Sequence, residues 1–119
     1  MHPGIINRVE TKERVVAFTF DDGPDAVYTP QLLEIFQEAG GKATFCMVGS
    51  QIDKNPDVAA AVHAAGHEIA NHTYTHPFLT RIDLEAAREE LLRTEERIRE
   101  VTGGKPVRTF RPPFFNAND

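Results

Sequence analysis

The apolar and polar positions of the chain fall into blocks that predict strands alternating with helices. Residues 14–20 are rich in Val and Phe and stop at the turn sequence Asp22-Gly23-Pro24, which is typical of a buried strand. A helix is expected next: Thr29-Pro30 favours its first turn, and Gly40-Gly41 favours its end. The apolar face of this helix comprises Leu32, Leu33, Phe36 and Ala39.

The same order recurs along the rest of the chain. Residues 43–48 are continuously apolar, as in a strand covered on both faces, and residues 68–71 and 107–110 are further strand candidates. One helix is expected within 55–66, opened by Asn-Pro, and a longer one within 83–103, capped by Asp and closed by Gly-Gly. Four successive β/α units predict a parallel α/β architecture.

The long helix is predicted to be amphipathic. Its apolar face comprises Leu84, Ala87, Leu91, Ile98 and Val101. The opposite face is charged and places Glu89 and Glu95 four residues before Arg93 and Arg99, a spacing that favours ion pairs. We interpret this charged face as solvated surface without a further role.

Composition and charge narrow the classes of function. The chain has 119 residues, enough for one domain with a modest core. A net charge of −5 gives no general attraction to nucleic acid or to anionic membranes. No run approaches the roughly 18 apolar residues that cross a bilayer, and residues 1–10 contain no signal peptide, so the compartment stays open. The single cysteine, Cys46, excludes an internal disulfide and is expected to be a small buried apolar side chain.

Three short motifs each follow a strand candidate. They are Thr19-Phe20-Asp21-Asp22-Gly23-Pro24, His72-Thr73-Tyr74-Thr75-His76 and Arg111-Pro112-Pro113-Phe114. Parallel α/β folds place their chemistry beyond the carboxyl ends of the strands, so we expect the motifs to share one site. Two imidazoles and a carboxylate can hold a metal ion and leave positions open for water and substrate. This combination predicts metal-assisted hydrolysis.

The first two motifs also have structural interpretations. His72 and His76 lie on one side of a helical turn or at two corners of a compact loop, or are polar surface residues; Thr73 would fix the loop or orient a ligand. Asp21-Asp22 is a common turn sequence, but two acids that end an apolar strand need partners. Adjacent residues of an extended chain point in different directions, so one carboxylate can bind metal while the other faces the reacting water.

The third motif adds a cation and a rigid backbone. Arg111 is either an ordinary surface cation or the partner of Asp21, which it would hold ionised and oriented. Pro112-Pro113 stiffens the chain and frees the Phe114 N–H to stabilise a developing oxyanion. The remaining histidines are not assigned to the metal: His2, an exposed His63 and a structural His67.

Taken together, the motifs resemble the first three motifs of the polysaccharide deacetylases of carbohydrate esterase family four, the NodB-like domains. They occur in the family's order, and the similarity runs through nearly the whole chain. The resemblance implies an α/β fold in which residues 1–119 are the first four β/α units of a distorted, incomplete (β/α) barrel, truncated after the third motif. It also implies a metal-dependent hydrolase that removes N-acetyl groups from N-acetylglucosamine-containing polysaccharide, of the peptidoglycan or chitin type, and releases acetate.

Carried over residue by residue, the resemblance assigns the site. The metal ligands are Asp22, His72 and His76, and the ion is zinc, with cobalt or nickel as alternatives. Asp21 is the general base and Arg111 tunes it, while the Phe114 N–H contributes to the oxyanion site. The implied partner is an N-acetylated glycan, and members of the family are often extracellular or associated with the cell wall.

The chain also departs from the family pattern. It has no Trp, and no histidine after Arg111 can act as the family's general acid; Phe115 replaces a frequent Gly. Loss of a general acid lowers the rate by on the order of 10²–10⁴-fold, so we expect the isolated chain to be nearly inactive. Open edges of a half barrel favour self-association. Two alternatives stay open: an esterase that removes O-acetyl groups from xylan, and a non-catalytic metal- or glycan-binding module, against which the retained Asp21 and Arg111 argue.

Overall fold

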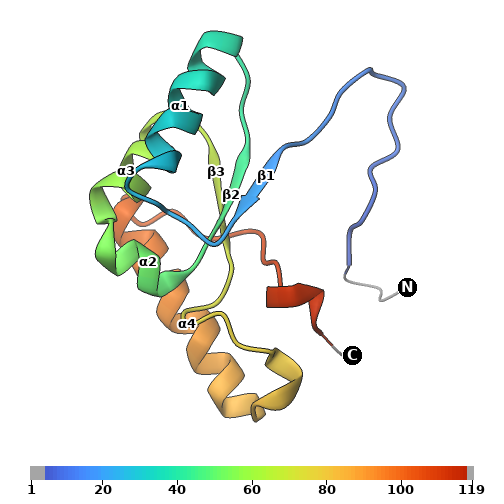
Figure 1. Cartoon of the computed structure of the whole chain (residues 1–119). Coiled ribbons are helices and arrows are strands. Elements are labelled where there is room, and N and C mark those ends of the chain that lie inside the picture. Colours follow the sequence, from blue (N-terminus) through green and yellow to red (C-terminus); the bar gives the residue numbers. More distant parts are fainter. Residues whose placement is uncertain (1–4, 118–119) are drawn as a thin grey trace.

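The computed structural model describes residues 5–117, so His2 lies outside the described residues. Three strands form a parallel sheet in the order β1-β2-β3 (Figure 1). They are β1 (Thr19–Asp21), β2 (Thr44–Met47) and β3 (Glu68–Asn71). The register pairs Asp21 with Cys46 and Cys46 with Ala70, which brings the carboxyl ends of the strands to one edge. The predicted α/β class with parallel strands is confirmed.

The described residues form four α-helices on one side of the sheet (Figure 1). They are α1 (Tyr28–Ala39), α2 (Gly49–Lys54), α3 (Pro56–Ala64) and α4 (Leu84–Val101). The helices α1, α2 and α3 connect the strands, and α4 follows β3. Two 3₁₀ turns, η1 (Leu79–Arg81) and η2 (Pro113–Phe115), follow in the loops. The long helix α4 packs against α2, α3 and β3, so it supports both the sheet and the loop that follows β3.

The core lies between the sheet and the helices. Its buried apolar residues are Phe36, Ala43, Phe45, Met47, Ile52, Ala59, Val62, Ile69 and Ile98. Cys46 is buried beside them, as predicted. His67 is also buried, and its Nδ1 accepts a hydrogen bond from the Ala43 N–H (3.0 Å), which confirms its structural role.

Two of the predicted strands are wrong in extent. Residues 14–18 are exposed and form no strand, because the pairing with β2 begins at Thr19; of these residues, only Phe18 accepts a hydrogen bond from β2, through its carbonyl from the Thr44 N–H (3.0 Å). Residues 107–110 form no strand either; a single bridge pairs Phe110 with Asn71, the last residue of β3. The described residues therefore contain three strands and one adjoining segment, in place of four complete units.

The first turns of α1 and α4 differ from prediction in part. Thr29 does not cap α1; the Asp25 carboxylate accepts the N–H groups of Val27 and Tyr28 instead. At α4 the Asp83 carboxylate accepts a hydrogen bond from the Ala86 N–H (2.8 Å), as predicted. Leu84, which was predicted to lie on the apolar face of α4, is instead 87% exposed.

The charged face of α4 is only partly solvated surface. Arg99 pairs with Glu95 (2.9 Å), as the spacing predicts. The guanidinium of Arg93 instead lies 3.7 Å from the centre of the Tyr74 ring, and Glu90 binds the loop after β3. Assignment of the whole face to solvent was therefore wrong.

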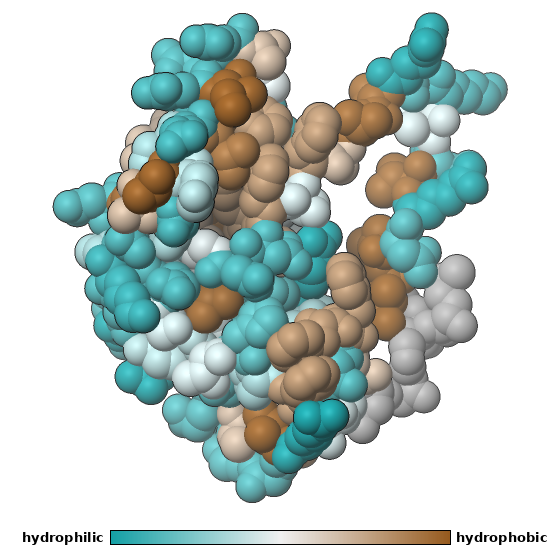
Figure 2. Space-filling model, viewed as in Figure 1, coloured by the Kyte–Doolittle hydropathy of each residue, from teal (hydrophilic) through white to brown (hydrophobic). Residues whose placement is uncertain are grey.

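The segment before β1 extends away from the body of the molecule, and apolar side chains lie along it (Figure 2). The exposed ones include Val15, Val16 and Phe18. Within residues 5–117, none of the helices is long and apolar enough to cross a membrane.

Candidate metal centre

The three motifs meet at the carboxyl edge of the sheet. Asp22 follows β1, His72 follows β3, and Arg111 follows the segment bridged to Asn71. The N–H groups of Asp22 and His72 both donate to carbonyls of β2 (3.1 and 3.0 Å), so the central strand fixes the first two motifs relative to each other. The Arg111 N–H donates to the Asn71 carbonyl (3.0 Å), which fixes the third motif next to the end of β3. The expectation that the motifs share one place is confirmed.

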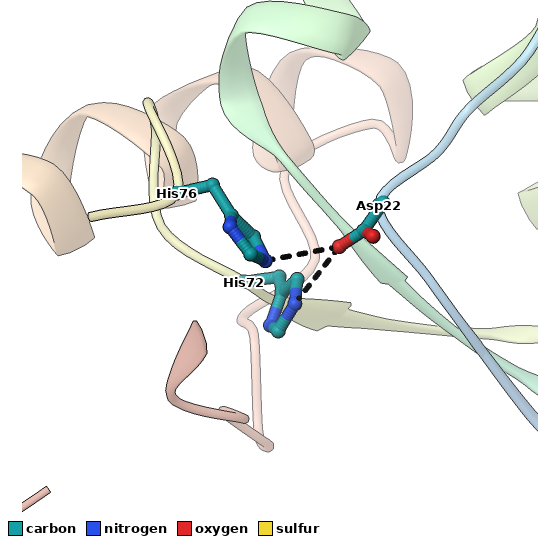
Figure 3. A group of neighbouring side chains, drawn as sticks. All are labelled: Asp22, His72 and His76. Carbon is teal, nitrogen blue, oxygen red and sulfur yellow. Dashed lines mark ion pairs between the residues drawn. The ribbon is translucent and has the colours of Figure 1, made fainter. Parts of the chain in front are cut away.

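Asp22, His72 and His76 point toward one another (Figure 3). The Asp22 Oδ1 lies 3.3 Å from the His72 Nε2 and 3.0 Å from the His76 Nε2. The three donor atoms all lie within 4.8 Å of one another. His72 is buried, whereas the Asp22 side chain is 69% exposed, so the group opens to solvent on one side.

The surroundings of His72 fix which ring nitrogen faces this group. Its Nδ1 lies 2.6 Å from the Arg111 carbonyl oxygen. A carbonyl oxygen only accepts hydrogen bonds, so Nδ1 carries the proton and Nε2 presents its lone pair. A backbone carbonyl behind the ring is the usual partner of a metal-binding histidine.

The donor set fits a metal ion in chemistry and in size. One carboxylate and two imidazoles are common zinc ligands, with bonds of about 2.0–2.2 Å. Ligand atoms at that distance in a tetrahedron are about 3.3–3.6 Å apart. The two separations from the Asp22 Oδ1 are close to this range, and the two imidazole nitrogens lie within 4.8 Å of each other, so Asp22, His72 and His76 converge closely enough to hold an ion.

Asp21 lies beside the donor set and is held by Arg111. The Arg111 guanidinium donates to the Asp21 Oδ1 (2.8 Å) and to the Thr19 Oγ1 (3.0 Å). The other oxygen, Oδ2, lies 3.8 Å from the His72 Nε2. One oxygen is therefore fixed by the cation, while the second is left next to the place where the three ligand atoms converge.

Thr73 is completely buried between the two histidines. Its N–H donates to the Asn71 side-chain oxygen (2.9 Å), and its hydroxyl accepts the His76 N–H (3.2 Å). Thr73 thus shapes a compact loop, which is one of the two arrangements expected for histidines at this spacing. Four residues of the site have a positive φ: Asp22 (75°), Thr73 (69°), His76 (63°) and Phe114 (58°).

Phe114 contributes a backbone donor and a ring. Among the described residues, no hydrogen bond uses the Phe114 N–H, in line with the prediction that the prolines free it. Its ring packs edge-on against His76, with centroids 4.7 Å apart, and stacks on Phe78 at 3.9 Å. This support of His76 was not predicted, because the sequence analysis gave Phe114 a role for its N–H alone and none for its ring.

Two further residues bear on the chemistry. Burial raises the pKa of the Cys46 thiol to about 12, so Cys46 is a neutral thiol near pH 7 and supplies no thiolate. Asn71 was missed by the sequence analysis: its side chain accepts from Thr73 and donates to the Leu91 carbonyl (2.9 Å). A polar residue that ends an apolar strand directly before His72 was the available signal.

Comparison with known proteins agrees with this geometry. The family profile of the polysaccharide deacetylases matches residues 8–119. The chain belongs to the polysaccharide deacetylase family. It is 38% identical over 99 residues to a peptidoglycan-N-acetylglucosamine deacetylase of Bacillus cereus. The aligned residues are 83% of this chain and 36% of that protein. A chitooligosaccharide deacetylase of Rhizobium leguminosarum bv. trifolii is 43% identical over 86 residues, 72% of this chain and 40% of the relative.

A solved member of the family has the same fold. The structure of peptidoglycan deacetylase PdaC from Bacillus subtilis matches with a TM-score of 0.87 and 33% identity, covering 93% of this chain and 55% of that chain. The chain therefore spans about a third to a half of the length of these family members. This match confirms the predicted NodB-like partial barrel, with an open sheet of three parallel strands.

Proposed function

We propose that residues 1–119 are part of one catalytic domain that removes N-acetyl groups from N-acetylglucosamine-containing polysaccharide, with a bound zinc ion. The observation that carries this proposal is the convergence of Asp22, His72 and His76 next to an Asp21 carboxylate held by Arg111. Cobalt and nickel fit the same donor set. Relatives named for peptidoglycan N-acetylglucosamine and for chitooligosaccharides support the glycan class.

In this proposal the chain's residues divide the work of hydrolysis. A zinc ion held by Asp22, His72 and His76 would lower the pKa of a bound water to about 7 and polarise the acetyl carbonyl. Asp21 accepts the proton of the attacking water on Oδ2, because Arg111 occupies Oδ1 and orients the carboxylate. The Phe114 N–H donates to the oxyanion that forms on the acetyl oxygen.

Protonation of the leaving amine needs a general acid. Within the described residues, His67 is engaged with Ala43 at the amino-terminal end of the sheet, and His63 lies on α3. Neither takes this role, so acetate release by these 119 residues is expected to be slower by on the order of 10²–10⁴-fold than in a domain with the acid.

Metal binding and hydrolysis by the 119-residue chain test the proposal together. Asp22→Ala should abolish zinc binding, measured as zinc bound per chain by mass spectrometry. Asp21→Asn should retain the zinc and abolish the residual release of acetate from chitin oligomers. A wild-type chain that binds no zinc, or acetate release that survives Asp22→Ala, would refute the assignment.

The substrates separate the alternatives. Release of acetate from acetylated xylan, with none from chitin oligomers, would identify an O-acetyl esterase that uses the same residues. Binding of the oligosaccharide without any acetate release, with Asp21 intact, would identify a non-catalytic binding module.

A further inference from the structure

The loop that carries both histidines is fastened to α4 by one carboxylate. Glu90 Oε2 accepts hydrogen bonds from the N–H groups of Tyr74 (2.7 Å) and Thr75 (2.8 Å). Glu90 Oε1 accepts a third from the Thr75 hydroxyl (2.6 Å). Tyr74 and Thr75 lie between His72 and His76, so Glu90 binds the part of the loop that sets the distance between the two rings.

Other contacts hold this loop on the carbonyl side: the N–H groups of Gly49 and Ser50 donate to the carbonyls of Thr73 (2.9 Å) and Tyr74 (3.0 Å). Asn71 donates to the Leu91 carbonyl at the beginning of the loop. The Tyr74 side chain is held by Arg93 above its ring and by a hydrogen bond from its hydroxyl to Asp53. For the backbone of Tyr74 and the whole of Thr75, the hydrogen-bond acceptors on α4 are the two oxygens of Glu90.

The loop needs such an acceptor for physical reasons. Thr73 and His76 both have a positive φ, a conformation that L-residues avoid unless the surroundings enforce it. The two adjacent N–H groups face the same carboxylate, which accepts from both with charge-assisted bonds. Without Glu90 these two N–H groups lose their acceptor, and the segment that leads to His76 is held only through the carbonyls of Thr73 and Tyr74 and the Tyr74 side chain.

We propose that Glu90 is a positioning residue, which keeps His76 in register with His72 and Asp22 by holding the backbone of Tyr74 and Thr75. It contacts neither the ion nor the substrate. This inference rests on the metal site of the proposed function. It predicts that hydrogen bonding by residue 90, rather than its charge, sets the affinity for metal.

A conservative pair of variants distinguishes the two properties. Glu90→Gln keeps an acceptor for both N–H groups, and its amide can donate to the Thr75 hydroxyl, so it preserves three hydrogen bonds without the charge. Glu90→Ala removes all three. Glu89→Ala alters the neighbouring exposed side chain and is the matched control.

The experiment is a Co²⁺ titration of the 119-residue chain, followed by visible absorption, with the melting temperature of each metal-free variant as a check on folding. Glu90→Ala should weaken Co²⁺ binding by about 10–100-fold, the usual effect of losing a residue that orients metal ligands. Glu90→Gln and Glu89→Ala should bind like the wild type, with the same absorption spectrum. A folded Glu90→Ala variant with wild-type affinity, or an equal loss in Glu90→Gln, overturns the inference.

Two milder variants decide the matter if Glu90→Ala does not fold. Glu90→Asp is too short to reach the loop, and Thr75→Val removes only the hydroxyl contact. The inference requires weaker binding by Glu90→Asp and a smaller loss for Thr75→Val, and wild-type affinity in both refutes it. A wild-type chain that binds no Co²⁺ refutes the metal site itself, and the role of Glu90 with it.

Discussion

Gly49 is a position at which one added methyl group should disturb the candidate metal centre, because it packs against the loop that carries both histidines. It is the first residue of α2 and is buried, and its N–H donates to the Thr73 carbonyl (2.9 Å). A Cβ at Gly49 would lie 2.7 Å from the Thr94 Oγ1, 3.2 Å from the Tyr74 Cα and closer still to the Tyr74 Cδ2. The Gly49→Ala variant must therefore displace the loop between the histidines.

The neighbours of Gly49 cannot move freely. The Thr94 hydroxyl donates to the Glu90 carbonyl (2.9 Å), and the Tyr74 ring is held by Arg93. Overpacking of this kind costs about 1–3 kcal/mol, against which the better helix propensity of Ala returns up to about 1 kcal/mol. We expect a net loss of about 1–2 kcal/mol in the free energy of unfolding, or roughly 4–8 °C in melting temperature.

Thermal unfolding and a Co²⁺ titration of the same samples measure both effects. Gly41→Ala is the control, because its Cβ would meet the Phe36 ring at 3.4 Å, an ordinary contact. Gly41→Ala should keep the melting temperature and the metal affinity, whereas Gly49→Ala should lower both. Wild-type values for Gly49→Ala would show that the Tyr74 loop accommodates the methyl group, and that close packing against α2 does not fix the histidines.

Two other predictions concern a buried histidine and an aromatic ring. Burial, with Lys42 adding to it, lowers the pKa of His67, so the contribution of its neutral ring to stability is complete above about pH 6.5 and is lost as the pH falls from there toward the folded-state pKa. The loss is up to about 1.4 kcal/mol per pH unit, and urea unfolding between pH 5 and 7.5 should show it in the wild type but not in His67→Gln; equal slopes in both proteins would contradict it. Phe114→Leu keeps the backbone N–H but removes the ring that packs on His76, so Co²⁺ affinity should fall by about 2–10-fold, as expected from about 0.5–1.5 kcal/mol for an aromatic pair. An unchanged titration would show that the ring does not orient His76.

Local pattern predicted those elements whose partners are near or whose signals are strong. The bounds of β3 and the Asp83 cap of α4 agree with the sequence, because a short apolar run and a capping carboxylate act locally. The helix α2 was not predicted, since its sequence Gly-Ser-Gln-Ile-Asp-Lys has no helical periodicity. It begins where it does because the N–H groups of Gly49 and Ser50 donate to the loop after β3, which is distant in sequence.

The candidate site could be predicted in its chemistry but not in its support. The type and spacing of side chains such as Asp22 and His72 indicate a metal site. The Arg111 carbonyl that orients His72 could not be predicted in this way, because every residue has a carbonyl and only the fold determines which one lies next to the His72 ring. Glu90 was equally hidden, since a glutamate among the charges of an amphipathic helix looks the same whether it faces water or a loop.

The backbone conformation of the site sets thermal stability against function. Asp22, Thr73, His76 and Phe114 all occupy the left-handed region, at about 1–2 kcal/mol for each L-residue, or about 4–8 kcal/mol together. At Asp22 and His76, glycine would relieve that strain while deleting a candidate metal ligand. Selection of variants for heat resistance alone would therefore favour glycine at these two positions, and it would yield more stable proteins without the candidate metal site.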